Sequence, residues 1–137
     1  MIARAGLALA LLLCLAPLAG GADEPVVAAA TEPVLKQLEA FRQGDFDTAY
    51  AFASEAIHHQ FDRAAFERMV TAGYPEIARS VFALVAQGEL APNGNVYLVL
   101  KIRGANGVSV EAVYELVTEA GAWKINAVVA RPDSGII

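Results

Sequence analysis

The chain has 137 residues, 56% of them hydrophobic and 18% charged, and its ten basic and fifteen acidic side chains give a net charge of −5. This length suits one small domain, which excludes multidomain enzymes and repeat arrays. The acidic balance, without a basic cluster, argues against nucleic-acid binding, because phosphate backbones are bound by positively charged surfaces.

Residues 1–22 have the pattern of a secretory signal peptide. A single charge, Arg4, precedes an apolar run over residues 5–19, and small residues follow up to Ala22. The run is shorter than the roughly 20 residues that span a bilayer, so no stable membrane span is expected after cleavage. The only cysteine, Cys14, lies in this run, and the leucine before it does not fit a lipidation site. The sequence therefore predicts a periplasmic or secreted protein without disulfides.

The rest of the chain is predicted to form one domain over residues 33–131. Residues 23–32 show no clear hydrophobic period, so we expect a flexible leader there. Residues 132–137 are expected to form a short C-terminal tail.

The first half of the domain has the apolar spacing of helices. Apolar residues recur at helical intervals over residues 34–41, with a proline at 33 in the expected first turn and Gly44 after the end. Asp45 and Asp62 are expected to cap two later helices, and Gly73 to end the second of these.

In the second half the hydrophobic period changes to two. Asn-Gly dipeptides and a further glycine mark turns between alternating segments, which is typical of β-hairpins. Four antiparallel strands are therefore predicted, at residues 79–90, 95–103, 108–118 and 122–131.

The strand register follows from side-chain alternation, because a slip by one residue exchanges the two faces of a sheet. Three-residue loops at the first two turns and a two-residue loop at the last one separate apolar from charged side chains. The resulting fold is α+β, with N-terminal helices packed on one face of a curved four-stranded antiparallel meander. Its predicted pairs include Leu90–Val96, Ala86–Leu100, Ile102–Val110, Leu116–Ile125 and Tyr114–Ala127.

The helix-facing side of this sheet is predicted to be apolar and to contain several small residues. These either make room for the helix phenylalanines or leave an apolar pocket. Tyr114 is the one residue with a polar tip on this face, and its hydroxyl needs a partner, either a helix side chain such as His58 or His59, or a ligand. The candidate pocket residues are Tyr114, Ala112, Tyr50, His58, Ala86 and Ala127.

The opposite face is predicted to carry a run of valines. This run either reflects the preference of valine for strands or forms a homodimer interface. The candidate interface residues are Val85, Val99, Val113 and Val128.

Three short motifs resemble those of an uncharacterised family of small exported bacterial proteins, known only as a domain of unknown function. The order of elements is similar to the cystatin-like cone fold of the nuclear transport factor two and ketosteroid isomerase superfamily. The resemblance covers residues 33–131 and implies the fold but no reaction, cofactor or ligand. The motifs are Ala49-Tyr50-x-Phe52-Ala53-Ser54, Phe66-x-x-Met69-Val70 and Gly73-Tyr74-Pro75.

The sequence leaves three classes of function to compare. An isomerase-type enzyme needs a carboxylate base beside a donor in the pocket, but the acidic residues are predicted on the outer face, at turns or at helix caps. His58 and Asp62 share helical spacing, yet capping explains Asp62 and no third metal ligand is evident. We therefore expect no cofactor or metal and favour non-catalytic binding of a small apolar or amphipathic ligand. The alternative is an assembly module that dimerises through the outer sheet face.

Overall fold

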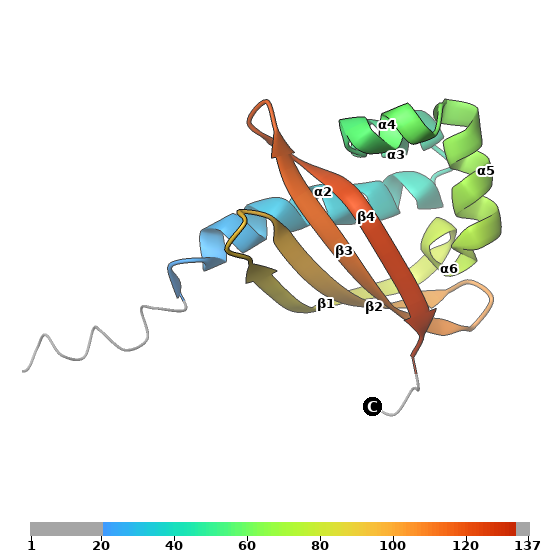
Figure 1. Cartoon of the computed structure of the whole chain (residues 1–137). Helices are drawn as coiled ribbons and strands as arrows, with labels where there is room; N and C mark the ends of the chain where they lie inside the picture. The colour runs from blue at the N-terminus through green and yellow to red at the C-terminus, as the bar shows by residue number, and fades with distance from the viewer. Residues whose placement is uncertain (1–20, 134–137) are drawn as a thin grey trace, which may run out of the picture.

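The computed structural model describes residues 21–133, so residues 1–20 of the predicted signal peptide and 134–137 of the predicted tail lie outside it. Within this range five helices are followed by four strands (Figure 1). The elements are α2 (Glu24–Arg42), α3 (Phe46–Ala51), α4 (Glu55–Gln60), α5 (Arg63–Gly73), α6 (Pro75–Ala78), β1 (Ser80–Leu90), β2 (Val96–Gly104), β3 (Ser109–Glu119) and β4 (Ala122–Pro132).

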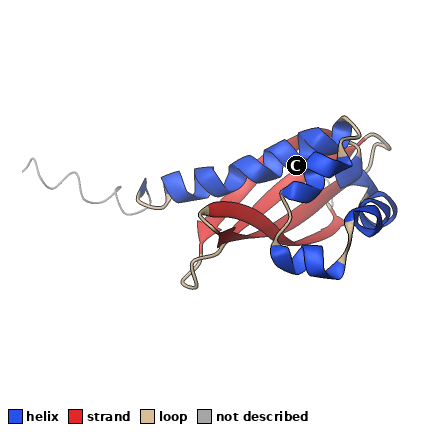
Figure 2. Ribbon diagram, turned by 90° about the horizontal axis from the view of Figure 1, so that it is seen from above, coloured by secondary structure: helices blue, strands red, loops and turns tan. Residues whose placement is uncertain are grey.

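The strands form one antiparallel sheet in the order β1-β2-β3-β4. Helix α2 lies along one face of the sheet, and the shorter helices gather at one end of it (Figures 1 and 2). α2 contacts β1, β2 and β4, while α6 contacts β1 and β2. The predicted α+β class, with helices packed against a four-stranded antiparallel sheet, is confirmed. Across residues 21–133, no helix combines the length and apolar character that crossing a membrane requires.

Helix α2 begins at Glu24, so the prediction of a flexible leader over residues 23–32 is wrong. Ala30 is fully buried, and Val26 and Val27 pack against the core. Pro33 lies inside the helix rather than in its first turn. Proline is common in the first turn of a helix, so the prediction started this helix at Pro33, which is later in the chain than its true start at Glu24.

The predicted helix caps are confirmed. The Asp45 carboxylate accepts a hydrogen bond from the Thr48 amide at 3.1 Å, and Asp62 accepts one from the Ala65 amide at 2.8 Å. Such bonds satisfy amides that a helix start leaves free. Gly44 follows α2 with a φ of +72°, a conformation that glycine adopts without strain.

A β-bulge in β1 reverses the predicted faces of the residues that precede it in the strand. The register shifts between Val85 and Gln87, so Val85 pairs with Leu100 and Ala86 is the extra residue. Val85 therefore faces the helices and packs against the core, whereas Ala86 is exposed. The predicted pair Ala86–Leu100 and the predicted outward orientation of Val85 are both wrong.

A second bulge has the same effect in β4. Leu116 pairs with Ile125 as predicted, but the next pair is Glu115 with Ala127, which leaves Asn126 as the extra residue. Tyr114 therefore lies opposite Val128, and the predicted pair Tyr114–Ala127 is wrong. Val128 packs against the core, so it does not belong to the outer face either. The predicted pairs Leu90–Val96 and Ile102–Val110, which lie away from the bulges, are confirmed.

Gly88 in β1 allows the first turns of α2 to approach the sheet closely. A Cβ atom at this position would lie 2.5 Å from Cγ1 of Val27 and 3.1 Å from Cδ2 of Leu98. These distances leave no room for a methyl group unless the helix or its side chain moves.

We expect Gly88→Ala to destabilise the domain by about 1–3 kcal/mol, because the added methyl overpacks the contact between α2 and β1. Gly73→Ala is the matched control, since its Cβ meets nothing within 4 Å. It should be neutral or stabilising by up to about 1 kcal/mol. Equilibrium denaturation measures both changes, and hydrogen exchange at residues 26–30 should rise only in Gly88→Ala. Equal stability of the two variants would contradict the prediction.

Candidate functional site

A pocket of about 340 Å³ lies between the helices and the inner face of the sheet, near β4. Its volume falls at the lower end of the roughly 300–1,000 Å³ that is typical of small-molecule sites. Most of its lining is aromatic or aliphatic, and none of the lining residues carries a charge. The apolar lining includes Phe41, Ile57, Phe61, Phe66, Met69, Val70, Ile77, Ile125 and Val128.

Tyr114 lines this apolar pocket and carries a hydroxyl group. The residue sits on the inner face of β3, between Leu98 of β2 and Val128 of β4, and its side chain is fully buried. In the part of the chain that the structure describes, its Oη atom has no hydrogen-bond partner. Burial also raises the pKa of the phenol, so the group keeps its proton. Tyr114 therefore presents an O–H that no protein group accepts.

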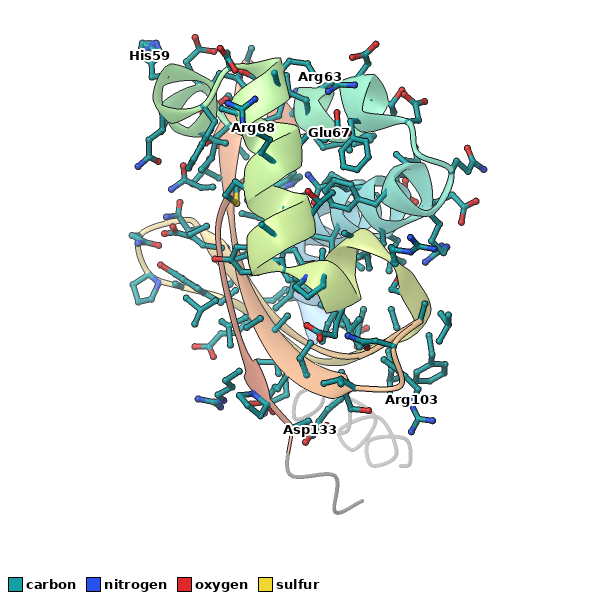
Figure 3. The ribbon with its side chains drawn as sticks, turned by 90° about the vertical axis from the view of Figure 1, so that its right-hand side faces the viewer. His59, Arg63, Glu67, Arg68, Arg103 and Asp133 are labelled. Carbon is teal, nitrogen blue, oxygen red and sulfur yellow. The ribbon has the colours of Figure 1, made fainter. Side chains whose placement is uncertain are left out.

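Neither histidine serves as the partner of Tyr114. His58 Nε2 lies 2.8 Å from the carbonyl oxygen of Tyr50, and the two rings pack with their centroids 4.1 Å apart. His59 points away from the domain (Figure 3), with 75% of its side chain exposed and Glu55 at 3.5 Å. The predicted alternative in which a histidine side chain forms a hydrogen bond with the Tyr114 hydroxyl is therefore wrong.

Three of the four other polar side chains of the lining are bonded to protein groups, and the fourth, Gln60, is exposed to solvent. Gln37 Nε2 donates to the carbonyl oxygen of Ala49 at 3.0 Å, and Tyr74 Oη donates to that of Val128 at 3.3 Å. The amide of Asn126 is bonded at both of its ends, to Ser54 and to Glu115. These hydrogen bonds hold Gln37, Tyr74 and Asn126 in the wall of the pocket, so the bonded atoms are already occupied before a ligand binds.

Asn126 connects the pocket to a carboxylate of the outer sheet face. Its Oδ1 accepts a hydrogen bond from Ser54 Oγ at 2.7 Å, and its Nδ2 donates to Glu115 Oε1 at 3.0 Å. Glu115 also accepts from Tyr97 Oη at 2.9 Å and from Asn95 Nδ2 at 3.0 Å. These bonds, with that from Asn126 foremost, lower the pKa of Glu115. The bulged residue of β4 is thus held firmly in place.

The pocket lining contains no carboxylate and no histidine. Within residues 21–133, no three His, Cys, Asp or Glu side chains lie close enough together to hold a metal ion. Tyr114 would be a proton donor without a base beside it, so the arrangement suits binding better than proton transfer.

Over residues 27–136 the chain matches the model of a family described as a domain of unknown function, DUF4864. The chain belongs to this family. The resemblance to an uncharacterised family of unknown function is thereby confirmed, while its placement in the cystatin-like superfamily stays a prediction. A comparison with curated proteins found none that matches.

The DUF4864 domain brings only some of the predicted pocket residues to the pocket. Tyr114 and Ala127 line it. Tyr50 and His58 pack beside it without belonging to the lining, and Ala112 is fully buried elsewhere in the core. The remaining candidate, Ala86, is the extra residue of the β1 bulge and is exposed.

Sequence reasoning missed Gln37, Tyr74 and Asn126. Gln37 is buried and lies three residues after Val34 on the inward stripe of α2, so a polar residue in an apolar helical stripe was the available signal. Tyr74 has no signal in the sequence beyond its place in the Gly73-Tyr74-Pro75 motif. Asn126 joins the pocket through the β4 bulge, which has no marker in the sequence.

The face of the sheet opposite to the helices carries an outer apolar patch. Val99 pairs with Val113, and Val113 pairs with Val129, so the three form a row across β2, β3 and β4. Phe82, Leu84 and Val129 are 57%, 52% and 64% exposed. This patch, formed by Phe82, Leu84, Val99, Val113 and Val129, keeps two of the predicted interface valines and loses Val85 and Val128 to the inner face.

Replacing Tyr114 with phenylalanine should not destabilise the ligand-free DUF4864 domain. The change removes a buried hydroxyl that no protein group accepts, so we expect equal stability or a gain of up to about 1 kcal/mol. Tyr50→Phe is the matched control, because its hydroxyl donates to the carbonyl oxygen of Phe61 at 2.6 Å. That variant should lose about 1 kcal/mol. Urea denaturation distinguishes the two, and a loss in Tyr114→Phe as large as that in Tyr50→Phe would contradict the assignment.

Proposed function

We propose that this DUF4864 domain binds a small apolar or amphipathic molecule in the pocket between helices and sheet, without catalysing a reaction. The observation that carries the proposal is the pocket of about 340 Å³ with an apolar, uncharged lining. Burial of an apolar molecule there is favoured by about 25 cal/mol for each Å² removed from water. Export, which rests on the predicted signal peptide at residues 1–22, would bring the domain into contact with ligands of the periplasm or the medium.

The walls of the pocket are held by packing that exists before a ligand arrives. Phe66 of α5 lies 6.1 Å from Phe41 of α2 and 5.2 Å from Tyr50 of α3, measured between ring centroids. Aromatic groups at these distances attract one another beyond simple burial. A preformed site loses less entropy on binding than one that must first be ordered, which supports a binding role.

Filling the pocket should abolish binding. Met69 lines the pocket from α5 and is half-buried, so Met69→Trp adds bulk at the lining without replacing a fully buried core residue. We expect the neutral probe N-phenyl-1-naphthylamine to bind the unmodified protein saturably and to bind Met69→Trp at least about tenfold more weakly, an affinity loss of about 1.4 kcal/mol.

Arg68→Trp is the matched control, because it places the same side chain on the exposed side of α5 (Figure 3). Its dissociation constant for the probe should equal that of the unmodified protein. The fluorescence of the probe is excited directly in this measurement, and not through the added tryptophan. Absence of saturable binding to the unmodified protein, or undiminished binding to a folded Met69→Trp variant, would overturn the proposal.

We propose homodimerisation through the outer apolar patch as the second candidate function. The observation that favours it is the exposure of Phe82, Leu84 and Val129 on one sheet face. Two cations beside the patch are ion-paired, with Lys101 3.4 Å from Asp133 and Arg131 bonded to Glu111, while Arg103 opposite Phe82 is exposed. A second copy would therefore meet little repulsion at this face, although the chain has a net charge of −5. An interface of this kind would be isologous, with the same patch on both protomers.

Val129→Lys tests this candidate. A lysine buried in a self-complementary apolar interface loses its hydration in both protomers, so the variant should sediment as a monomer at concentrations where the unmodified protein is a dimer. Val108→Lys is the control, because Val108 is also exposed but precedes β3. A monomeric unmodified protein, or a Val129→Lys variant with the mass of the dimer, would contradict the proposal.

A further inference from the structure

We propose that the ligand is an uncharged molecule with an apolar body and one hydrogen-bond acceptor, such as a ketone, ester or amide carbonyl, and that the Tyr114 hydroxyl donates to this acceptor. The inference deepens the proposed binding function and rests on it.

The donor is identified by elimination among the buried and half-buried polar residues of the pocket lining, because Gln60, which also lines the pocket, is exposed to solvent. Gln37 Nε2, Tyr74 Oη and Asn126 Nδ2 each donate a hydrogen bond to a protein oxygen. Among the described residues, Tyr114 Oη is the one buried side-chain polar atom without a partner. A ligand that supplies an acceptor there restores the hydrogen bond that the phenol loses on burial.

The absence of charge in the lining sets the second requirement. An ionised carboxylate or ammonium group would leave water without meeting a counter-ion, because none of the lining residues is acidic, basic or a histidine. The hydroxyl of Tyr114 alone does not replace the hydration shell of an ion. The net charge of the chain, −5, further disfavours the binding of anions.

The aromatic and aliphatic side chains of the lining favour a ligand whose apolar part is aromatic or aliphatic. Phe41, Phe61 and Phe66 surround the pocket together with Met69, whose flexible thioether adapts to irregular ligands. A volume of about 340 Å³ limits the ligand to a small molecule.

The test uses a matched pair of neutral naphthalenes. In 2-acetylnaphthalene a carbonyl oxygen stands where 2-isopropenylnaphthalene has a CH₂ group, so the pair differs in the acceptor and little in shape. Each compound is titrated against bound N-phenyl-1-naphthylamine, and the ratio of the two dissociation constants is compared between proteins. We expect the preference for the ketone to fall about fivefold in Tyr114→Phe, with the hydrocarbon binding as well as before or better.

Tyr50→Phe is the control, because the Tyr50 hydroxyl is committed to Phe61 and lies outside the lining. It should keep the ratio of the unmodified protein. Unchanged ratios in Tyr114→Phe would overturn the inference and leave the apolar pocket standing. Competition by 2-naphthoate as strong as that of the ketone would overturn the requirement for a neutral ligand. Failure of the probe and both neutral compounds to bind the unmodified protein would overturn the proposed function itself.

Discussion

The regular register of the β2–β3 hairpin is the constraint on which the rest of the molecule depends. Its strands pair without a bulge, and Gly107 closes the turn with a φ of +83°. The inward side chains Leu98, Leu100 and Tyr114 are fully buried, while the outward neighbours alternate with them. A slip by one residue would turn charged groups of both strands toward the helices, so the apolar pattern admits one pairing. Helix α2 packs on the same inner face, where it contacts β2 and the flanking strands β1 and β4.

The flanking strands use this regular centre differently because each contains a bulge. In β4 the extra residue Asn126 changes which side chains face inward, so four consecutive residues, 125–128, line the pocket. A regular strand directs only alternate residues to one face. The bulge therefore brings more of β4 to the pocket than pleating allows, and the bonds of Asn126 to Ser54 and Glu115 hold it there.

The features that could be predicted from sequence are those with a local physical cause. The caps Asp45 and Asp62 have their own hydrogen bonds within one turn, and the hairpin register follows from alternation within two strands. The bulges could not be predicted, because no special residue is required and their stability depends on contacts with distant elements. The first turns of α2 were missed for the same reason, since the close approach at Gly88 is a tertiary contact. Pro33 then supplied a false local signal for the helix start.

Tyr114 was identified from the sequence as a buried phenol in need of a partner, but the sequence offered histidines as well as a ligand. The decision depended on where α4 directs its side chains, and that follows from packing: His58 bonds to Tyr50, and His59 lies in solvent. A core optimised only for stability would carry phenylalanine at this position, since an unpaired buried hydroxyl lowers stability. Local rules of folding are obeyed on the inner face around Tyr114, where Leu98, Leu100 and Leu116 are fully buried and apolar. A single violation at the wall of an apolar pocket has its simplest physical explanation in a group that arrives from outside the chain.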